Sequence, residues 1–294
     1  MSSMRISKGE KIFRFVNLIV LIVLSIACLY PLLYCLWASL SDSNQLMAHR
    51  GILLYPLEFT LNAYKKVVEN PMVLIGFKNT FIVLAGGLFF NMVLTVLGAY
   101  FLARKDIYFK NFVLLIFMVT MFFSGGLIPT YLTVKSLNLD NTLWAVILPT
   151  AVNTYNMIIL RTGFASVPYS LCEAAKIDGA NDLSILKNVY LPLTKASLAV
   201  VCLYYAVTHW NSWFNAAIYL NDRHKYPIQL VLREILITND LSSMSSGASL
   251  EDIQGVGLSI QYATIIVSTL PILALYPFLQ RYFVTGVMLG SVKE

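Results

Sequence analysis

The polar residues of segment 170–192 stand out because most of the remaining sequence is strongly apolar. Ser170 and Glu173 have the spacing of a capping box, which predicts a helix that starts at Leu171 with its first amide groups satisfied by both side chains. Such capping leaves the second carboxylate oxygen of Glu173 free to contact another molecule. The chemistry expected of this segment is therefore recognition of a soluble partner by a helical surface.

A turn and a second helix are expected to follow the first helix. Asp178 precedes Gly179, which can adopt the left-handed conformation that a tight turn requires. Asn181 is a suitable N-cap for a helix over about 182–189, and Pro192 is expected to end that helix. The segment is thus predicted to form two short helices joined at a glycine.

A second group of polar and aromatic residues lies inside two of the apolar stretches. It consists of Asn153, Tyr155, His209, Trp210, Asn211 and Trp213. Aromatic faces and amide groups suit the apolar faces and hydroxyl rims of sugars, so this group is a candidate wall of a substrate pathway for carbohydrate. The same residue types also form interfacial aromatic belts and interhelical amide bonds, and the sequence leaves both interpretations open.

The sequence contains no set of residues typical of an active site. There is no phosphate-binding GxxxxGK[ST] motif, and His49, His209 and His224 lie far apart with no second ligand at helical spacing. The apolar stretches also lack the paired carboxylates that proton-coupled carriers and membrane proteases use. We therefore expect neither catalysis nor a bound metal or cofactor in this chain.

The spacing within the polar segment resembles the EAA loop of ABC-transporter permeases. The pattern is Glu173-Ala174-Ala175, three residues, Gly179, nine residues and Val189-x-Leu191-Pro192, where Val189 replaces the usual isoleucine. The resemblance implies that a partner ATPase contacts this loop, with Glu173 and Gly179 at its cleft. It implies an ATPase-coupling role for Glu173, Ala174, Ala175, Asp178, Gly179, Leu191 and Pro192.

Other segments resemble the maltose-permease-like (MalG-like) carbohydrate importers, and most closely their LplC/YtcP-type oligosaccharide permeases. The matching residues are Tyr30-Pro31-Leu32, Ser39-Leu40-Ser41-Asp42, Pro56, Phe59-Thr60-Leu61, Tyr64, Asn79-Thr80, Trp210-Asn211, Tyr282-Phe283-Val284 and Gly286. This resemblance implies an all-α polytopic membrane protein with six transmembrane helices of the MetI-like permease type and a cytoplasmic coupling helix pair. It also implies a heteromeric complex with a second homologous permease subunit, two ABC ATPase subunits that bind ATP and Mg, and an extracytoplasmic substrate-binding protein.

The composition independently places the chain in a membrane. Apolar residues make up 58% of the sequence and charged residues only 12%, whereas soluble domains carry about 25% charged residues. Six stretches are long enough to cross a bilayer as helices. The first is expected to be a retained span, because its apolar run is too long for a signal peptide and lacks a small-x-small cleavage site. The predicted limits of the six spans are about 15–40, 79–102, 111–134, 142–160, 196–220 and 256–280.

The net charge of +6 indicates the orientation of the chain and not a nucleic-acid partner. Basic residues concentrate in the N-terminal segment and in alternate loops, and three of them lie in the short loop 103–110. By the positive-inside rule, both termini and loop 161–195 are cytoplasmic, and loop 221–255 is external. We expect a multi-pass protein of the bacterial cytoplasmic membrane, in which residues 1–294 form one transmembrane permease domain in contact with membrane lipid.

Three local features can also be predicted. A short surface helix is expected near 61–68, and Gly125, Gly126 and Pro129 are expected to kink the third span. Loop 221–255 contains a Ser/Gly-rich run and is expected to be flexible. The resemblance to maltose-type permeases implies that this loop contacts the binding protein.

Together these features predict the permease subunit of an ATP-driven ABC importer. It would move an oligosaccharide or related sugar from an extracytoplasmic binding protein into the cytoplasm by alternating access. One alternative is an ABC permease for a non-sugar solute, which would carry the same EAA loop. The other is a secondary carrier, although such carriers typically show inverted repeats and membrane carboxylates, and the sequence shows neither.

Overall fold

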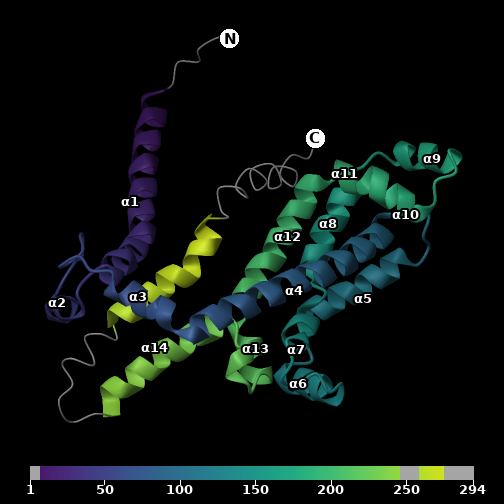
Figure 1. The fold of residues 1–294 in the computed structure, drawn as a ribbon. Coiled ribbons are helices and arrows are strands. Elements are labelled where there is room, and N and C mark those ends of the chain that lie inside the picture. The colour runs from purple at the N-terminus through teal and green to yellow at the C-terminus, as the bar shows by residue number, and fades with distance from the viewer. Residues whose placement is uncertain (1–6, 246–257, 275–294) are drawn as a thin grey trace. The chain divides into compact units, whose positions relative to one another are not determined.

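The computed structural model of the protein describes residues 7–245 and 258–274 (Figure 1). Within these ranges the regular elements are helices and no strand is formed, so the all-α prediction is confirmed. The chain divides into two compact units. Unit 1 comprises Met1–Asn70 and Ile235–Thr269, and unit 2 comprises Pro71–Glu234 and Leu270–Glu294.

Unit 1 contains the N-terminal helix, two short helices and a later apolar helix. The apolar side chains of the first helix are largely exposed, as those of a helix that faces lipid or another apolar subunit need to be. The surface helix predicted near 61–68 is confirmed. The elements are α1 (Lys8–Ser39), α2 (Ser43–Ala48), α3 (Asn62–Glu69), the second part, 235–245, of α14 (Ile228–Ser245) and residues 258–269 of the helix Leu258–Ala274.

The C-terminal end of α1 packs in a small core of unit 1. Ala38 and Leu46 are buried there together with Leu53. The hydroxyl of Ser259 donates a 3.1 Å hydrogen bond to the carbonyl of Ser41, which ties the helix Leu258–Ala274 to the residues directly after α1. The apolar core and this polar contact together fix the end of a helix that is otherwise exposed.

Unit 2 is built around the long helix α4, which packs against α8 and α12. Figure 1 shows α9 and α10 at the same end of this unit as the α4–α5 connection, and α6, α7 and α13 at the opposite end. The elements are α4 (Pro71–Ala103), α5 (Lys110–Phe122), α6 (Leu127–Ser136), α7 (Trp144–Ile147), η1 (Leu148–Thr150), α8 (Thr154–Ala165), α9 (Tyr169–Ile177), α10 (Asp182–Ile185), the π-helical turn η2 (Leu186–Tyr190), α11 (Leu191–Leu193), α12 (Lys195–Trp210), α13 (Trp213–Tyr219), η3 (Arg223–Lys225) and the first part, 228–234, of α14 (Ile228–Ser245).

A row of glycines allows three helices to approach α4 closely. Gly76, Gly87 and Gly98 recur at intervals of about three helical turns. A Cβ atom at Gly87 would lie 2.3 Å from the His209 Nε2 atom of α12, and one at Gly98 would lie 2.6 Å from the Met157 sulfur of α8. At Gly76 the nearest atoms belong to the first residue of α14. Small residues thus set the spacing of the helices that pack on α4, as they commonly do in membrane proteins.

Two described helices, α1 and α4, are individually long and apolar enough to cross a membrane. Two bent pairs meet the same criterion if each pair is counted as one span. One of them is α5 with α6, where the kink predicted at Gly125–Pro129 is confirmed as a 113° bend. The six-span count stays a prediction, and the end of the sixth stretch, 275–280, lies outside the described residues.

The helices expected over 142–160 and 196–220 are not continuous. The first is divided into α7, η1 and α8, because a proline occupies the short 3₁₀ turn η1 and Asn153 caps a new helix after it. The second breaks after Trp210 and resumes as α13. Apolarity alone did not indicate these breaks, because apolar residues lie on both sides of each break.

Loop 221–255 is more ordered than predicted. The helix α14 occupies Ile228–Ser245, so the expectation of a flexible loop is wrong for those residues. The physical reason is the apolar start of the helix, where Ile228, Leu230 and Val231 are buried. Residues 246–257 and the family-like tail at 282–286 lie outside the described residues.

Candidate functional site

The first helix of the polar segment begins earlier than its sequence predicts. α9 starts at Tyr169, and no side chain caps its N-terminus. Ser170 therefore lies within the first turn, and the capping-box prediction for Ser170 and Glu173 is wrong. The reason is Pro168, whose extended backbone (ψ 126°) leads directly into the first turn and places the helix start one residue after it.

The turn after α9 has the geometry that the sequence predicts. Gly179 has a φ angle of 80°, in the left-handed region. The amide of Ala180 donates a 2.9 Å hydrogen bond to the carbonyl of Ala175, which is the pattern of a Schellman helix end. Asn181 Oδ1 then accepts a 2.8 Å bond from the amide of Ser184 and caps the next helix. The helical run continues through Pro192 to Leu193, one residue further than predicted.

The two helices form a protruding pair, here called the helix pair (Tyr169–Leu193), with an exposed face and a buried face. Two apolar side chains protrude into solvent from the exposed face, Ile177 at 87% and Leu183 at 68% exposure. The predicted coupling residues that are also exposed are Glu173, Ala174, Asp178, Gly179 and Pro192. Ala175 and Leu191 are partly buried and pack against the core of unit 2.

Four charged side chains connect the helix pair to the end of α4, and we call them the ionic cluster: Arg104, Asp106, Lys176 and Asp182. Asp106 accepts hydrogen bonds from Arg104 Nε (2.8 Å) and Lys176 Nζ (2.9 Å). The other end of the Arg104 guanidinium contacts Asp182 at the start of α10. Hydrogen bonds from Arg104, and then from Lys176, hold the pKa of Asp106 far below its usual range, and the bond that Lys176 donates to Asp106 raises the pKa of Lys176.

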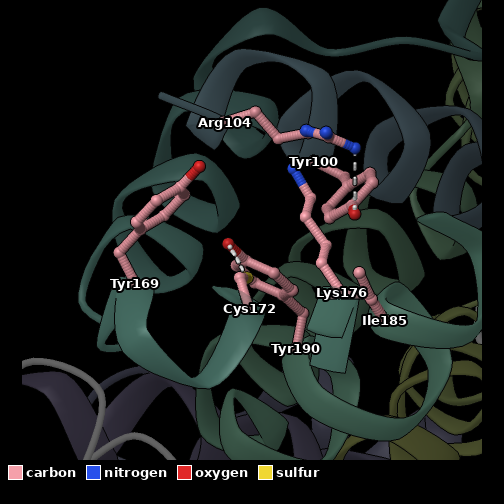
Figure 2. A pocket seen from close by; sticks show the side chains of 7 residues that line it. All are labelled: Tyr100, Arg104, Tyr169, Cys172, Lys176, Ile185 and Tyr190. Atoms are coloured by element: carbon pink, nitrogen blue, oxygen red, sulfur yellow. Dashed lines mark hydrogen bonds between the residues drawn. The ribbon is translucent and has the colours of Figure 1, made fainter. Parts of the chain in front are cut away.

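Aromatic rings continue this connection into the core (Figure 2). The guanidinium of Arg104 lies 5.6 Å from the ring centroid of Tyr100, and Tyr100 meets Tyr190 edge-on at 5.2 Å. Tyr190 in turn packs on Phe164 of α8 at 5.5 Å and accepts a hydrogen bond from the thiol of Cys172. Burial, and then the bond with Cys172, raise the pKa of Tyr190 well above its usual range. Most of the polar side chains that line the small pocket in Figure 2 are therefore already engaged with other residues of the chain.

Sequence reasoning missed the ionic cluster as a unit. In the sequence, Arg104 served only as one of the basic residues of loop 103–110 that indicate the orientation of the chain. The signal that could have found the cluster is Asp106, the one acidic residue in that basic loop. One of its partners, Lys176, lies seventy residues away in sequence, so this contact depends on the packing of α9 against the end of α4.

The second predicted group is not gathered on one surface. His209 and Trp210 are buried, at 1% and 3% exposure, where α12 packs on α4. Trp210 lies between Phe77 and Phe81, and His209 Nε2 is 3.3 Å from Asn91 Oδ1. Among the described residues, neither His209 Nδ1 nor Trp210 Nε1 has a hydrogen-bond partner. These two residues therefore belong to the helix interface, as the alternative interpretation of the sequence allowed.

The remaining members of the second group are exposed or half-buried. Asn153 and Asn211 are exposed at helix ends, where Asn153 Oδ1 caps α8 and Asn211 Nδ2 bonds to the carbonyl of Val207. Trp213 is half-buried beneath the guanidinium of Arg233, 3.9 Å from its ring centroid. Tyr155 is exposed, and its ring lies 6.4 Å from that of Tyr204.

These positions leave an aromatic and polar surface where α8 meets α12, formed by Tyr155, Tyr204 and Thr208. Tyr204 and Thr208 were not predicted, although their spacing of four residues places them on one face of α12. Within the described residues, no group of three or more His, Cys, Asp or Glu side chains could hold a metal ion. What this surface offers chemically is the ring faces of Tyr155 and Tyr204 and the hydroxyl of Thr208, which itself donates a 2.8 Å hydrogen bond to the carbonyl of Tyr204.

Trp210→Ala is expected to destabilise the protein, because Trp210 is buried between α12 and α4. Removal of a buried indole from between Phe77 and Phe81 costs about 3–5 kcal/mol of the free energy of unfolding. Thermal unfolding of the purified variant in detergent measures this loss. An unchanged unfolding midpoint together with a weakened apparent affinity for solute would contradict the burial. It would indicate instead that Trp210 lines the candidate substrate pathway.

Comparisons with known proteins address the identity of the chain. Residues 107–289 match the family described as binding-protein-dependent transport system inner membrane component. The Bacillus subtilis (strain 168) polygalacturonan/rhamnogalacturonan transport system permease protein YtcP is 40% identical over 93% of this chain and 95% of its own length. Protein LplC of the same strain is 38% identical over 99% of this chain and 98% of its own length.

A solved structure is similar over almost the whole chain. It is the crystal structure of a bacterial ABC transporter involved in the import of the acidic polysaccharide alginate, one chain of which matches with a TM-score of 0.84 and 30% identity. The match covers 96% of this chain and 100% of that chain. The resemblance to ABC-transporter permeases of the LplC/YtcP type is thereby confirmed. The chain belongs to the family of binding-protein-dependent transport system inner membrane components, the permease subunits of ABC transporters.

Proposed function

We propose that this chain is the permease subunit of an ATP-driven importer that takes an oligosaccharide from an extracytoplasmic binding protein. The names of its relatives support a sugar as the solute, because they refer to polygalacturonan or rhamnogalacturonan and to alginate. Its partners are a second permease subunit, two ATPase subunits and the binding protein. Both termini and the helix pair face the cytoplasm in this proposal, since the positive-inside rule places them there.

The observation that carries the proposal is the exposed face of the helix pair. Ile177 and Leu183 are large apolar side chains that are mostly exposed, and Glu173, one helical turn before Ile177 on α9, is exposed as well. A protruding helical pair with apolar residues and one carboxylate suits a cleft in a partner protein. The partner's ATPase cycle would move the helix pair, and the helix pair would move the spans that carry it.

The mechanism that fits this arrangement is alternating access. ATP binding draws the two ATPase subunits together, and the helix pairs of the two permease chains move with them. The spans then open toward the binding protein and receive the sugar, and hydrolysis returns them to the inward-facing state. ATP and Mg are bound by the ATPase subunits, and this chain contributes helices that transmit force and line the pathway.

The proposal is tested by reconstitution of the complete complex in proteoliposomes. The external binding protein is loaded with oligogalacturonides, alginate oligosaccharides or, as a non-sugar control, an amino-acid mixture, and ATP is enclosed on the cytoplasmic side. We expect ATP-dependent accumulation of at least one oligosaccharide and of no amino acid. ATP-dependent uptake of amino acids alone would show a permease for a non-sugar solute, and accumulation driven by an ion gradient without ATP would show a secondary carrier.

Within this function, the surface formed by Tyr155, Tyr204 and Thr208 is proposed as part of the sugar pathway. Tyr155→Ala is expected to raise the KM for uptake by about threefold to tenfold, because one aromatic face that packs on the sugar is lost. The matched control is Tyr108→Ala, since Tyr108 is also exposed but lies in the α4–α5 connection. Equal KM values for both variants and the unaltered protein would remove Tyr155 from the pathway.

A further inference from the structure

We propose that the ionic cluster is a second route by which movement of the helix pair reaches the membrane-spanning helices. Its four members are positioning residues for coupling: they touch neither sugar nor nucleotide, and they tie the helix pair to α4. This inference rests on the proposed function, since it concerns how the energy of ATP enters the same chain.

The covalent route from the helix pair to α12 contains a sharp bend. The helical run Asp182–Leu193 meets α12 at an angle of 87°, and Thr194 lies between them. A bend of this kind can absorb part of a displacement by changing its angle, as hinge residues do. A further contact between the helix pair and α4 is therefore needed if α4 is to move together with the helix pair.

The ionic cluster provides such a contact because its members come from three separate segments. Arg104 and Asp106 follow the last residue of α4, Lys176 is in the last turn of α9, and Asp182 is the first residue of α10. Arg104 joins both helices of the pair, through Asp106 to Lys176 and directly to Asp182. The pair therefore cannot move away from the end of α4 unless these contacts break.

Because of the position of Arg104, these contacts are expected to hold the helix pair to α4 more strongly than ordinary surface ion pairs would. An isolated exposed pair contributes only about 0–1 kcal/mol. The side chain of Arg104 is only 14% exposed, and it also packs on Tyr100 within the aromatic series that leads to Phe164 of α8. The cluster thus belongs to a network that joins the end of α4 to the helix pair and to α8, and networks of this kind can carry coupling between sites.

Hydrogen bonds also connect the end of α4 to α5 and α8. The ammonium group of Lys110, the first residue of α5, donates a hydrogen bond to the carbonyl of Arg104. Arg161 of α8 donates from its Nε atom to the carbonyl of Leu102, 3.3 Å away. Because α4 packs along α8 and α12, movement imposed at its end is shared with the helices that carry Tyr155 and Tyr204.

The test compares Asp106→Asn with the unaltered chain in the reconstituted complex, and it measures sugar transported per ATP hydrolysed. Asparagine keeps the size of the side chain but loses the charge that holds Arg104 and Lys176. We expect the ATPase rate and the copurification of the ATPase to be unchanged, and transport per ATP to fall about fivefold. Asp106→Glu, which keeps the carboxylate, is expected to restore most of the ratio.

Glu69→Gln is the matched control, because it breaks an exposed ion pair with Lys65 (4.0 Å) on α3 in unit 1. Its transport per ATP is expected to equal that of the unaltered chain. The proposal is overturned if Asp106→Asn and Lys176→Gln both leave the ratio unchanged, or if they lower it only by releasing the ATPase subunits. A failure of the proposed function is distinguishable, since the unaltered complex would then show no ATP-dependent sugar uptake.

Discussion

Gly179→Val is expected to abolish sugar transport while the protein remains in the membrane. The φ angle of 80° at this residue is left-handed, a conformation that costs an L-residue about 1–2 kcal/mol and a β-branched residue more. The helices on both sides are short, so the turn relieves this strain by changing the angle between them. The exposed face formed around Glu173 and Ile177 would then no longer match the partner cleft. Uptake and ATPase activity of the reconstituted complex measure the effect.

The matched control at the same position is Gly179→Asn, because asparagine tolerates the left-handed region better than other L-residues with a Cβ atom. No atom outside the immediate neighbours lies within 4 Å of a Cβ placed at Gly179, so steric contact is not the cause of the loss. We expect the asparagine variant to transport at a rate close to that of the unaltered chain. Full coupled transport by Gly179→Val would falsify the coupling role of this turn.

The parts of the helix pair that sequence predicts are those decided by local backbone chemistry. The glycine turn needs a left-handed residue, and Asn181 needs only the amide three residues ahead of it, so both were predictable. The capping box was wrong for a reason that is also local, because Pro168 starts the helix before Ser170 can cap it. A capping pattern is therefore weaker where a proline immediately precedes it.

The parts that sequence could not predict depend on contacts between distant segments. Asp106 stands out as the one acidic residue in a basic loop, but the sequence does not identify Lys176 as its partner, and only the packing of α9 on the end of α4 brings the two together. The burial of His209 and Trp210 is similar, because a polar aromatic residue on an apolar helix can face a pathway or a neighbouring helix. In this chain the two residues face the neighbouring helix α4, because Gly87 of α4 leaves space for the imidazole ring of His209.

Gly87→Ala is the second change expected to have a large effect, and it tests the close approach of α12 to α4. The added methyl carbon would lie 2.3 Å from His209 Nε2 and 2.6 Å from Cε1 of the same ring, far inside van der Waals contact. The imidazole cannot move aside freely, since it is 1% exposed and lies against Asn91. Overpacking of this kind costs about 1–3 kcal/mol of the free energy of unfolding, measured by thermal unfolding in detergent.

The neighbouring residue and the opposing ring supply the controls for Gly87→Ala. Gly86→Ala should be tolerated, because its methyl would meet only the end of the Ile147 side chain at 3.3 Å. In the His209→Ala background the ring is absent, so Gly87→Ala should cost nothing further and can partly fill the cavity that the first change leaves. The two changes are then strongly non-additive, as expected for residues in direct contact. If Gly87→Ala destabilises the protein equally with and without the His209 ring, the two helices do not meet at this point.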